Sequence, residues 1–251
     1  MQLHPQLQAQ LQAQCNLKNH SPFCTMWFSA LSIAIGIGTF SLTDRLLTRL
    51  GFQGVYYAIH ALHNAAVVYA TFPDVQHTFE HFGTIAQYNN NQIAINLVYA
   101  LHLYHCILYW RKFRSDDWLH HILMIGLALP IGTYYESHTL VGFSLFFTTG
   151  LPGCIDYALL FGVRNGWVSR LTEKKVNRAL NVWIRSPGCV AAAVFNVAFV
   201  CEKLPPNSPI FWMVIAPALL NYWNGQYFMG QVVADYAQLE NMATTTALNR
   251  I

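Results

Sequence analysis

Charged residues are scarce in this sequence. Asp, Glu, Lys and Arg make up only 10% of its 251 residues, against roughly 25% in ordinary soluble domains, whereas 54% of the residues are hydrophobic. The net charge is +3 with histidine neutral, and the few charges lie in short clusters between long apolar runs. This composition excludes an ordinary soluble domain, argues against a nucleic-acid partner and predicts an all-α integral membrane protein.

Linkers, internal repeats and a signal peptide are missing as well. The chain has no Ser/Gly-rich stretch, no detectable repeat and, at its start, no basic segment followed by an apolar core. Apolar runs of about 17 to 25 residues, enough to cross a bilayer, recur along its length. They predict about seven transmembrane helices, at residues 24–42, 54–72, 92–110, 119–135, 139–162, 180–201 and 209–233.

Lysine and arginine are unevenly distributed among the loops between these helices. The second and fourth loops have none, and the sixth has only Lys203. The first, third and fifth loops contain Arg45, Arg49, Arg111, Lys112, Arg114, Arg164, Arg170, Lys174, Lys175 and Arg178. By the positive-inside rule we expect these three loops and the C-terminus on the cytoplasmic side, and the N-terminus on the lumenal or extracellular side.

Polar side chains gather in the half of the membrane that this orientation makes cytoplasmic. They are His60, His63, His102, His105, His120, His121, Asp156, Asn181, Arg185, Asn221, Asn224 and Gln226. Such groups are costly in lipid, so we expect them to face a shared internal cavity that opens to the cytoplasm. The alternative interpretation is a set of interhelical hydrogen bonds that only holds the helices together.

The segment SDDWLHHILM opens the fourth expected helix with two acids and two adjacent histidines. Asp116 and Asp117 precede His120 and His121 by four residues, so each carboxylate can reach an imidazole on the same helix face. A carboxylate that accepts from one ring nitrogen leaves the other free as a base or nucleophile. The acids also suit the first turn of a helix with Ser115 as its N-cap, so both roles remain open.

Signatures of metal and retinal sites are absent. His60 and His63, like His102 and His105, have the spacing at which two imidazoles can share a metal, but H-x-x-H-H never occurs, so no metal site is predicted. The seventh expected helix has no lysine to form a Schiff base with retinal. Four prolines, at positions 130, 152, 187 and 217, predict kinks in the last four helices.

The residues Asp117-Trp118-Leu119-His120-His121-Ile122 and, more loosely, Thr149-Gly150-Leu151-Pro152-Gly153-Cys154-Ile155-Asp156-Tyr157 resemble the TLC-domain family. The family takes its name from translocation-associated, longevity-assurance and CLN-type membrane proteins. The resemblance covers roughly residues 54–233 and implies a six-helix barrel around a lipid chain. The remaining segments are a tail at 1–23, a first transmembrane helix with its loop at 24–53, and a cytoplasmic tail at 234–251.

The family includes ceramide synthases, which transfer an acyl group from acyl-CoA to the amine of a sphingoid base in the endoplasmic reticulum. By this resemblance His120 and His121 are the catalytic histidines, and Asp156 matches the second aspartate of the family's H-D-x-x-D segment. The sequence departs from that segment at its first two positions, which are Pro152 and Gly153 here. The remaining polar residues of the cytoplasmic half, together with Asp117, would line the site.

We therefore expect a lipid acyltransferase with acyl-CoA as co-substrate, no bound cofactor and membrane lipid as partner. The resemblance also implies the endoplasmic reticulum as location. The alternative is a TLC protein without catalysis that binds lipid, regulates membrane composition or escorts cargo. Gly153 favours this alternative, whereas His120, His121 and Asp156 favour the enzyme. A homodimer is left open.

Overall fold

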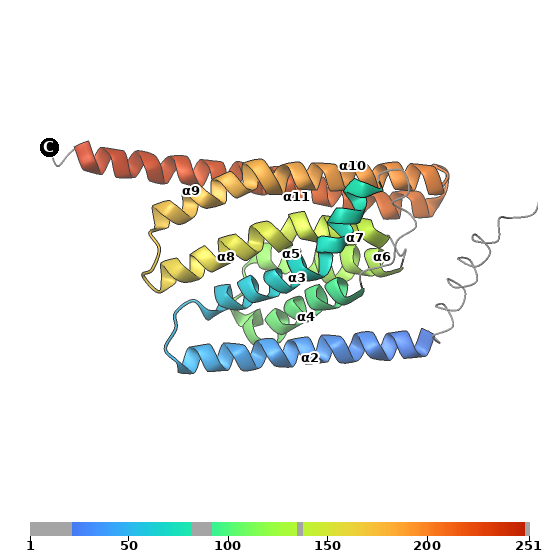
Figure 1. Ribbon diagram of the computed structural model, residues 1–251, viewed down its shortest axis with the longest axis horizontal. Coiled ribbons are helices and arrows are strands. Elements are labelled where there is room, and N and C mark those ends of the chain that lie inside the picture. Colours follow the sequence, from blue (N-terminus) through green and yellow to red (C-terminus); the bar gives the residue numbers. More distant parts are fainter. Residues whose placement is uncertain (1–21, 82–91, 135–137, 249–251) are drawn as a thin grey trace, which may run out of the picture.

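The computed structural model describes residues 22–81, 92–134 and 138–248. Helices account for 91% of these residues, and no strand occurs among them (Figure 1). The α-helices are α2 (Pro22–Arg49), α3 (Val55–Glu80), α4 (Gln92–Tyr109), α5 (Ser115–Leu123), α6 (Leu129–Tyr134), α7 (His138–Leu145), α8 (Leu151–Arg164), α9 (Arg170–Leu180), α10 (Ser186–Lys203) and α11 (Pro209–Leu248). One 3-10 turn, η2 (Trp110–Lys112), and three π-helical turns, η3 (Met124–Ala128), η4 (Phe146–Gly150) and η5 (Asn181–Arg185), join them into longer runs.

The all-helical fold expected from the sequence is confirmed for the described residues. Within them, four helical runs are long and apolar enough to cross a membrane, namely Trp27–Arg49, Gln92–Lys112, Leu140–Arg164 and Arg170–Glu202. Asp117–Ile131 is a shorter apolar helix. Several helices are longer than expected. The first continues to Arg49 rather than 42, and the second to Glu80 rather than 72. The sixth begins at Arg170 rather than 180, and the seventh continues to Leu248 rather than 233. Polar turns extend these helices beyond their apolar parts, and hydropathy alone does not detect such turns.

Each π-helical turn ends two residues before a proline. Pro130 follows η3, Pro152 follows η4 and Pro187 follows η5. A proline inside a helix has no N–H to bond the carbonyl four residues earlier, and its ring clashes with that carbonyl. In all three cases that carbonyl belongs to the π turn, whose wider winding relieves the clash. The fourth proline, Pro217, lies inside α11 without such a turn.

The helices lie roughly along one axis (Figure 1). The helix α2 forms one edge and packs on α4, while α10 and α11 pack together along the opposite edge, with α3 and α8 between them. The hydroxyl groups of Tyr104 and Tyr109, on α4, both donate to the carboxylate of Asp44 on α2. Gly36 lets the same two helices approach closely, because a Cβ there would lie 2.7 Å from the Cβ of Ala100.

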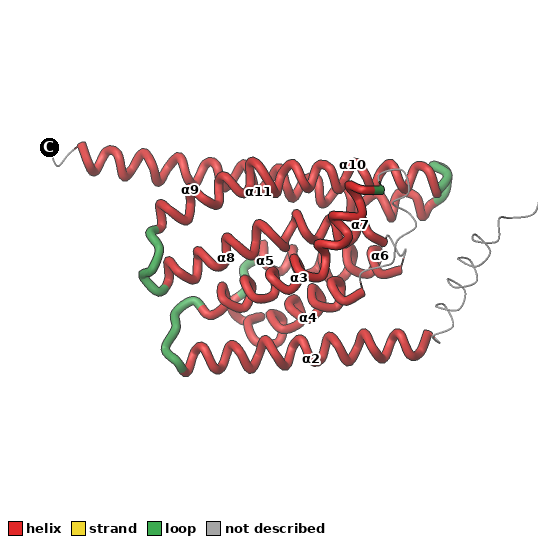
Figure 2. Tube along the Cα trace, viewed as in Figure 1, coloured by secondary structure: helices red, strands yellow, loops and turns green. Residues whose placement is uncertain are grey.

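Three loops whose flanking helix ends carry basic residues meet at one end of the molecule. Loops 50–54 and 165–169 lie together, while loop 204–208 is at the opposite end (Figure 2). The backbone N–H of Gln53 donates to Asn165 Oδ1 at 3.1 Å, and Asn165 Nδ2 donates to the Gln53 carbonyl at 3.0 Å. Lys112 and Phe113, from the third loop, line a pocket with Gln53. The loops that the positive-inside rule assigns to one side are therefore neighbours.

Candidate functional site

Five histidines from α3, α4 and α5 form one connected cluster of rings. His60 stacks on His105 with ring centroids 4.5 Å apart, and His105 lies 5.8 Å from His121. The His102 ring lies 5.3 Å from His121 and 5.2 Å from His120. All except His120 are buried. Some of these ring pairs are stacked face to face and others meet edge to face. In the described ranges, no group of three or more metal-ligating side chains has the geometry of a metal site.

The hydrogen bonds of His102 determine which nitrogen of His120 carries the proton. His102 Nδ1 lies 2.7 Å from the carbonyl oxygen of Val98, which can only accept. Neutral His102 therefore carries its proton on Nδ1 and has a bare Nε2. That Nε2 lies 3.2 Å from His120 Nε2, so neutral His120 donates from Nε2. The free lone pair of His120 is consequently on Nδ1, where it can act as a base.

His121 is oriented by backbone rather than by a carboxylate. Its Nδ1 donates to the main-chain carbonyl of Asp117 at 2.7 Å, and its other ring nitrogen, Nε2, is buried without a partner. The carboxylate of Asp117 instead accepts from the backbone N–H of Arg114 at 2.9 Å. Arg114 occupies the N-cap position, so the expectation of Ser115 as N-cap was wrong by one residue. The side chain of Asp116 lies outside the described part of the structure.

Asn64 fills the space beside Gly153. A Cβ at Gly153 would lie 2.4 Å from Asn64 Nδ2, so any larger residue at 153 must displace the amide. Asn64 Oδ1 accepts from Thr149 Oγ1 at 3.0 Å and lies 3.0 Å from His63 Nδ1. His63 is thus bound in a polar contact next to the five-ring cluster, and it packs edge-on against Phe40.

A cavity of about 350 Å³ lies beside the cluster, and His120 is the only one of the five histidines that lines it. Its walls come from α4, α5, η3, α6, α7, η4, α10 and α11 and are mostly apolar. Leu119 and Trp223, at its rim, are exposed on the outside of the bundle. The cavity therefore opens sideways between α5 and α11, where a membrane would present acyl chains.

The polar atoms along the α11 wall of this cavity come from two asparagines. Asn224 Oδ1 accepts from Arg185 Nη2 at 2.9 Å, and Asn221 Oδ1 accepts from Thr148 Oγ1 at 2.6 Å. The Arg185 guanidinium also lies over the ring of Phe228, 4.6 Å from its centroid. Among the described residues Arg185 forms no ion pair.

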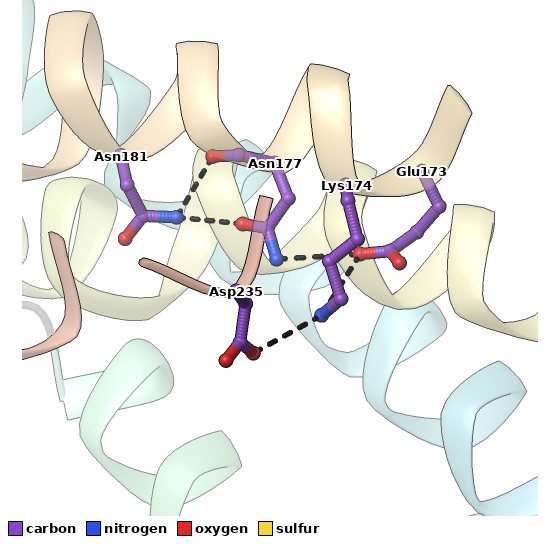
Figure 3. Close-up of polar contacts among 5 residues, drawn as sticks. All are labelled: Glu173, Lys174, Asn177, Asn181 and Asp235. Atoms are coloured by element: carbon purple, nitrogen blue, oxygen red, sulfur yellow. Dashed lines mark hydrogen bonds and ion pairs between the residues drawn. The ribbon is translucent and has the colours of Figure 1, made fainter. Parts of the chain in front are cut away.

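Asp156, on α8, interacts with the carboxyl group of Glu173 on α9. Its Oδ1 atom is buried without a hydrogen-bond partner. Glu173 begins a buried series on α9 in which Asn177 Nδ2 donates to Glu173 Oε1 at 3.4 Å and Asn181 Nδ2 donates to Asn177 Oδ1 at 2.6 Å (Figure 3). Lys174 lies 3.7 Å from Glu173 and 3.8 Å from Asp235 of α11 (Figure 3). Among the described residues, neither Asp156 nor Asn181 makes a hydrogen bond or ring contact with the five histidines.

A second pocket, of about 590 Å³, lies where the basic loops meet. Its walls include Tyr56 and Tyr57 from α3, Lys112, and Arg164 from the end of α8. Gly54 opens this pocket with a left-handed φ of 66°, and a Cβ there would lie 2.7 Å from Arg164 Cγ. The Tyr56 ring also stacks on His105 at 4.9 Å, which connects the pocket to the histidine cluster.

Several residues of the site were not expected from the sequence. Asn64, Glu173, Tyr56 and Tyr157 were not selected, although Tyr157 packs on His60 at 4.4 Å. The repeat Glu173, Asn177, Asn181, Arg185 at intervals of four could have indicated a polar helix face. The tyrosines carry no comparable pattern.

Comparison with known proteins assigns no relationship, because no family model, curated protein or solved structure matches this chain. The geometry alone defines the site as a buried histidine cluster between a lateral apolar cavity and a basic, aromatic pocket.

Proposed function

We propose that the protein is a TLC-type membrane acyltransferase that moves an acyl group from acyl-CoA to the amine of a lipid, with His120 as the base. One observation supports this most directly: His120 lines the apolar cavity while its Nε2 is 3.2 Å from the bare Nε2 of His102. The imidazole of His120, which can act as a base, thus lies at the wall of a cavity suited to a lipid acyl chain.

The reaction needs a proton to move from the amine to the leaving sulfur. The amine nitrogen attacks the thioester carbonyl carbon, and His120 Nδ1 takes the proton that the amine loses. The C–S bond then breaks, and the same proton passes from His120 to the CoA thiolate. His120 is cationic between these steps, and His102 Nε2 stabilises it by accepting its Nε2–H, since Val98 holds His102 in the matching tautomer.

The basic, aromatic pocket supports CoA as the donor. Lys112 and Arg164 supply positive charge for phosphates, and Arg164 is held over the ring of Tyr57. The thioester would then lie near the histidine cluster, into which Tyr56 packs.

In this proposal His102, rather than Asp156, orients His120, because His120 forms its hydrogen bond with His102 and Asp156 interacts with Glu173. Lipid binding without catalysis is the second candidate. The Asn64 amide favours it, because that amide occupies the space beside Gly153 where the resembling family has an aspartate.

The proposal also includes the endoplasmic reticulum as location, a lumenal N-terminus and a cytoplasmic C-terminus. Four apolar helical runs among the described residues support membrane insertion. The clustering of the basic loops at one end supports the orientation.

Transfer of labelled palmitoyl-CoA to a panel of long-chain amines and lysolipids, using purified protein in detergent, tests the enzyme. We expect His120→Ala and His102→Ala to lower the rate by about 10²- to 10⁴-fold, as for loss of a general base. His81→Ala is the matched control, since His81 is exposed at the far end of α3. No product from wild-type protein that still copurifies with lipid would favour the non-catalytic candidate.

A further inference from the structure

We infer that the ligand of the lateral cavity is an amphiphile with an acidic head, a carboxylate or a phosphate, bound at Asn224 and Asn221 in front of Arg185. This inference rests on the proposed function and specifies its acyl acceptor, whose amine would face His120 while the acid lies at the asparagines. His120, Asn221 and Asn224 all line the same cavity.

The orientation of the Asn224 amide follows from its partner. A guanidinium has N–H donors and no acceptor, so the atom 2.9 Å from Arg185 Nη2 must be the amide oxygen. The NH₂ group of Asn224 is then directed away from Arg185, and no hydrogen bond to it occurs among the described residues. Because Asn224 lines the cavity, this NH₂ group is available to a ligand that accepts.

Two further unsatisfied atoms near this wall are donors. Asn221 Nδ2 is buried without a partner, while its oxygen accepts from Thr148. Arg185 Nε is likewise buried without a partner. Unpaired buried donors are costly, and a ligand rich in acceptor oxygens removes that cost.

The positive charge of Arg185 predicts a negative charge on the head of the ligand. Arg185 belongs to a helical run that is apolar enough to cross a membrane, and its guanidinium contacts an amide and a ring. The carboxyl group of Asp156 acts on it electrostatically but, among the described residues, no carboxylate forms an ion pair with it. A charge in such surroundings strongly favours an opposite charge nearby. The head of the ligand lies one hydrogen bond in front of it, across Asn224, and the chain occupies the apolar remainder of the cavity.

Equilibrium binding of tritiated palmitate to the purified protein at pH 8 tests this, with hexadecyl phosphate and hexadecanol as competitors. We expect both anions to bind at least about tenfold more tightly than the alcohol of equal length, as for hydrogen bonds to a charged group. Arg185→Gln should remove this preference and leave hexadecanol binding unchanged, which also shows that the variant is folded. Arg178→Gln is the matched control: its guanidinium also stacks on an aromatic ring, Tyr236, but among the described residues it makes no hydrogen bond to a residue that lines the cavity.

Equal affinity of wild-type protein for palmitate and hexadecanol would overturn the inference while leaving acyl transfer by His120 intact. An undiminished preference for anions in Arg185→Gln would overturn it as well. Failure of wild-type protein to bind any of the three chains would overturn both this inference and the proposed function. A preference for only one of the two anions supports the inference and identifies the acid.

Discussion

At the scale of single residues, Gly153 and Asn64 determine how α3 and α8 meet. The amide of Asn64 lies where a Cβ at 153 would be, and its oxygen serves both Thr149 and His63. Packing against Asn64 thus explains why position 153 is a glycine, which the sequence did not show. From the sequence it was only a departure from a family pattern.

Gly153→Ala should destabilise the protein by about 1–3 kcal/mol, the usual cost of forcing an extra group into a packed core. Thermal unfolding in detergent, followed by circular dichroism, measures the change. Gly230→Ala is the control, because a Cβ at this helical position meets no atom within 4 Å and should be neutral or slightly stabilising. Adding Asn64→Ala to Gly153→Ala should cost less than the sum of the two single changes. Strict additivity would show that Asn64 is not the obstacle.

The sequence predicted which polar residues share one end of the bundle, but not their partners. His60, His102, His105, His120 and His121 do lie together, since helical depth alone places them at one level. Of the two roles left open for Asp117, the structure shows the capping one: its carboxylate accepts from the Arg114 N–H, and His121 Nδ1 donates to the Asp117 main-chain carbonyl instead. Helix rotation, which depends on the whole packing, turned Asp156 toward Glu173.

At the scale of elements, the run from α9 through η5 into α10 has a buried polar beginning and an apolar end. The series of hydrogen-bonded side chains from Glu173 through Asn177 to Asn181 lies on a helix that packs against α8 and α11. Arg185 follows one turn further along the same helical run. The four prolines predicted kinks in the last four helices. The sequence did not show that a π-helical turn would precede three of these prolines. That outcome depends on how neighbouring helices satisfy the freed backbone.

Asn177→Ala should lower the free energy of unfolding by about 1–3 kcal/mol, because it removes the buried amide that bonds to both the Glu173 carboxylate and Asn181. Lys175→Ala, on the exposed side of α9, is the matched control and should change stability by less than about 0.5 kcal/mol. Chemical unfolding of both variants in the same detergent gives the comparison. A loss no greater than that of the control would mean that water replaces the missing amide.

At the scale of the whole molecule, the two ends differ in charge. The basic loops and the basic start of α9 share one end, and loop 204–208 lies at the other. The hydropathy of the sequence was enough to predict this separation, since alternate loops must lie on opposite sides of a bilayer. The hydropathy could not predict the lateral opening between α5 and α11, because that opening depends on how the kinked helices diverge.

Single cysteines at Lys175 and Asn207, both exposed, test the arrangement in the membrane. In sealed vesicles of a protein whose native cysteines are replaced by serine, we expect a membrane-impermeant maleimide to label the two positions from opposite sides. The cysteine at 175 should be labelled from the cytoplasmic side. Labelling of both from one side would rule out the proposed topology.

The length of α11 makes the outline of the molecule asymmetric. At about 1.5 Å per residue, a helix of 40 residues measures roughly 60 Å, twice the roughly 30 Å of a bilayer's hydrocarbon core. Its last turns extend past the end of α9 (Figure 1). In a nanodisc this bare rod would stand out from one face only, so it would act as a built-in fiducial mark for aligning particle images and for telling the two leaflets apart.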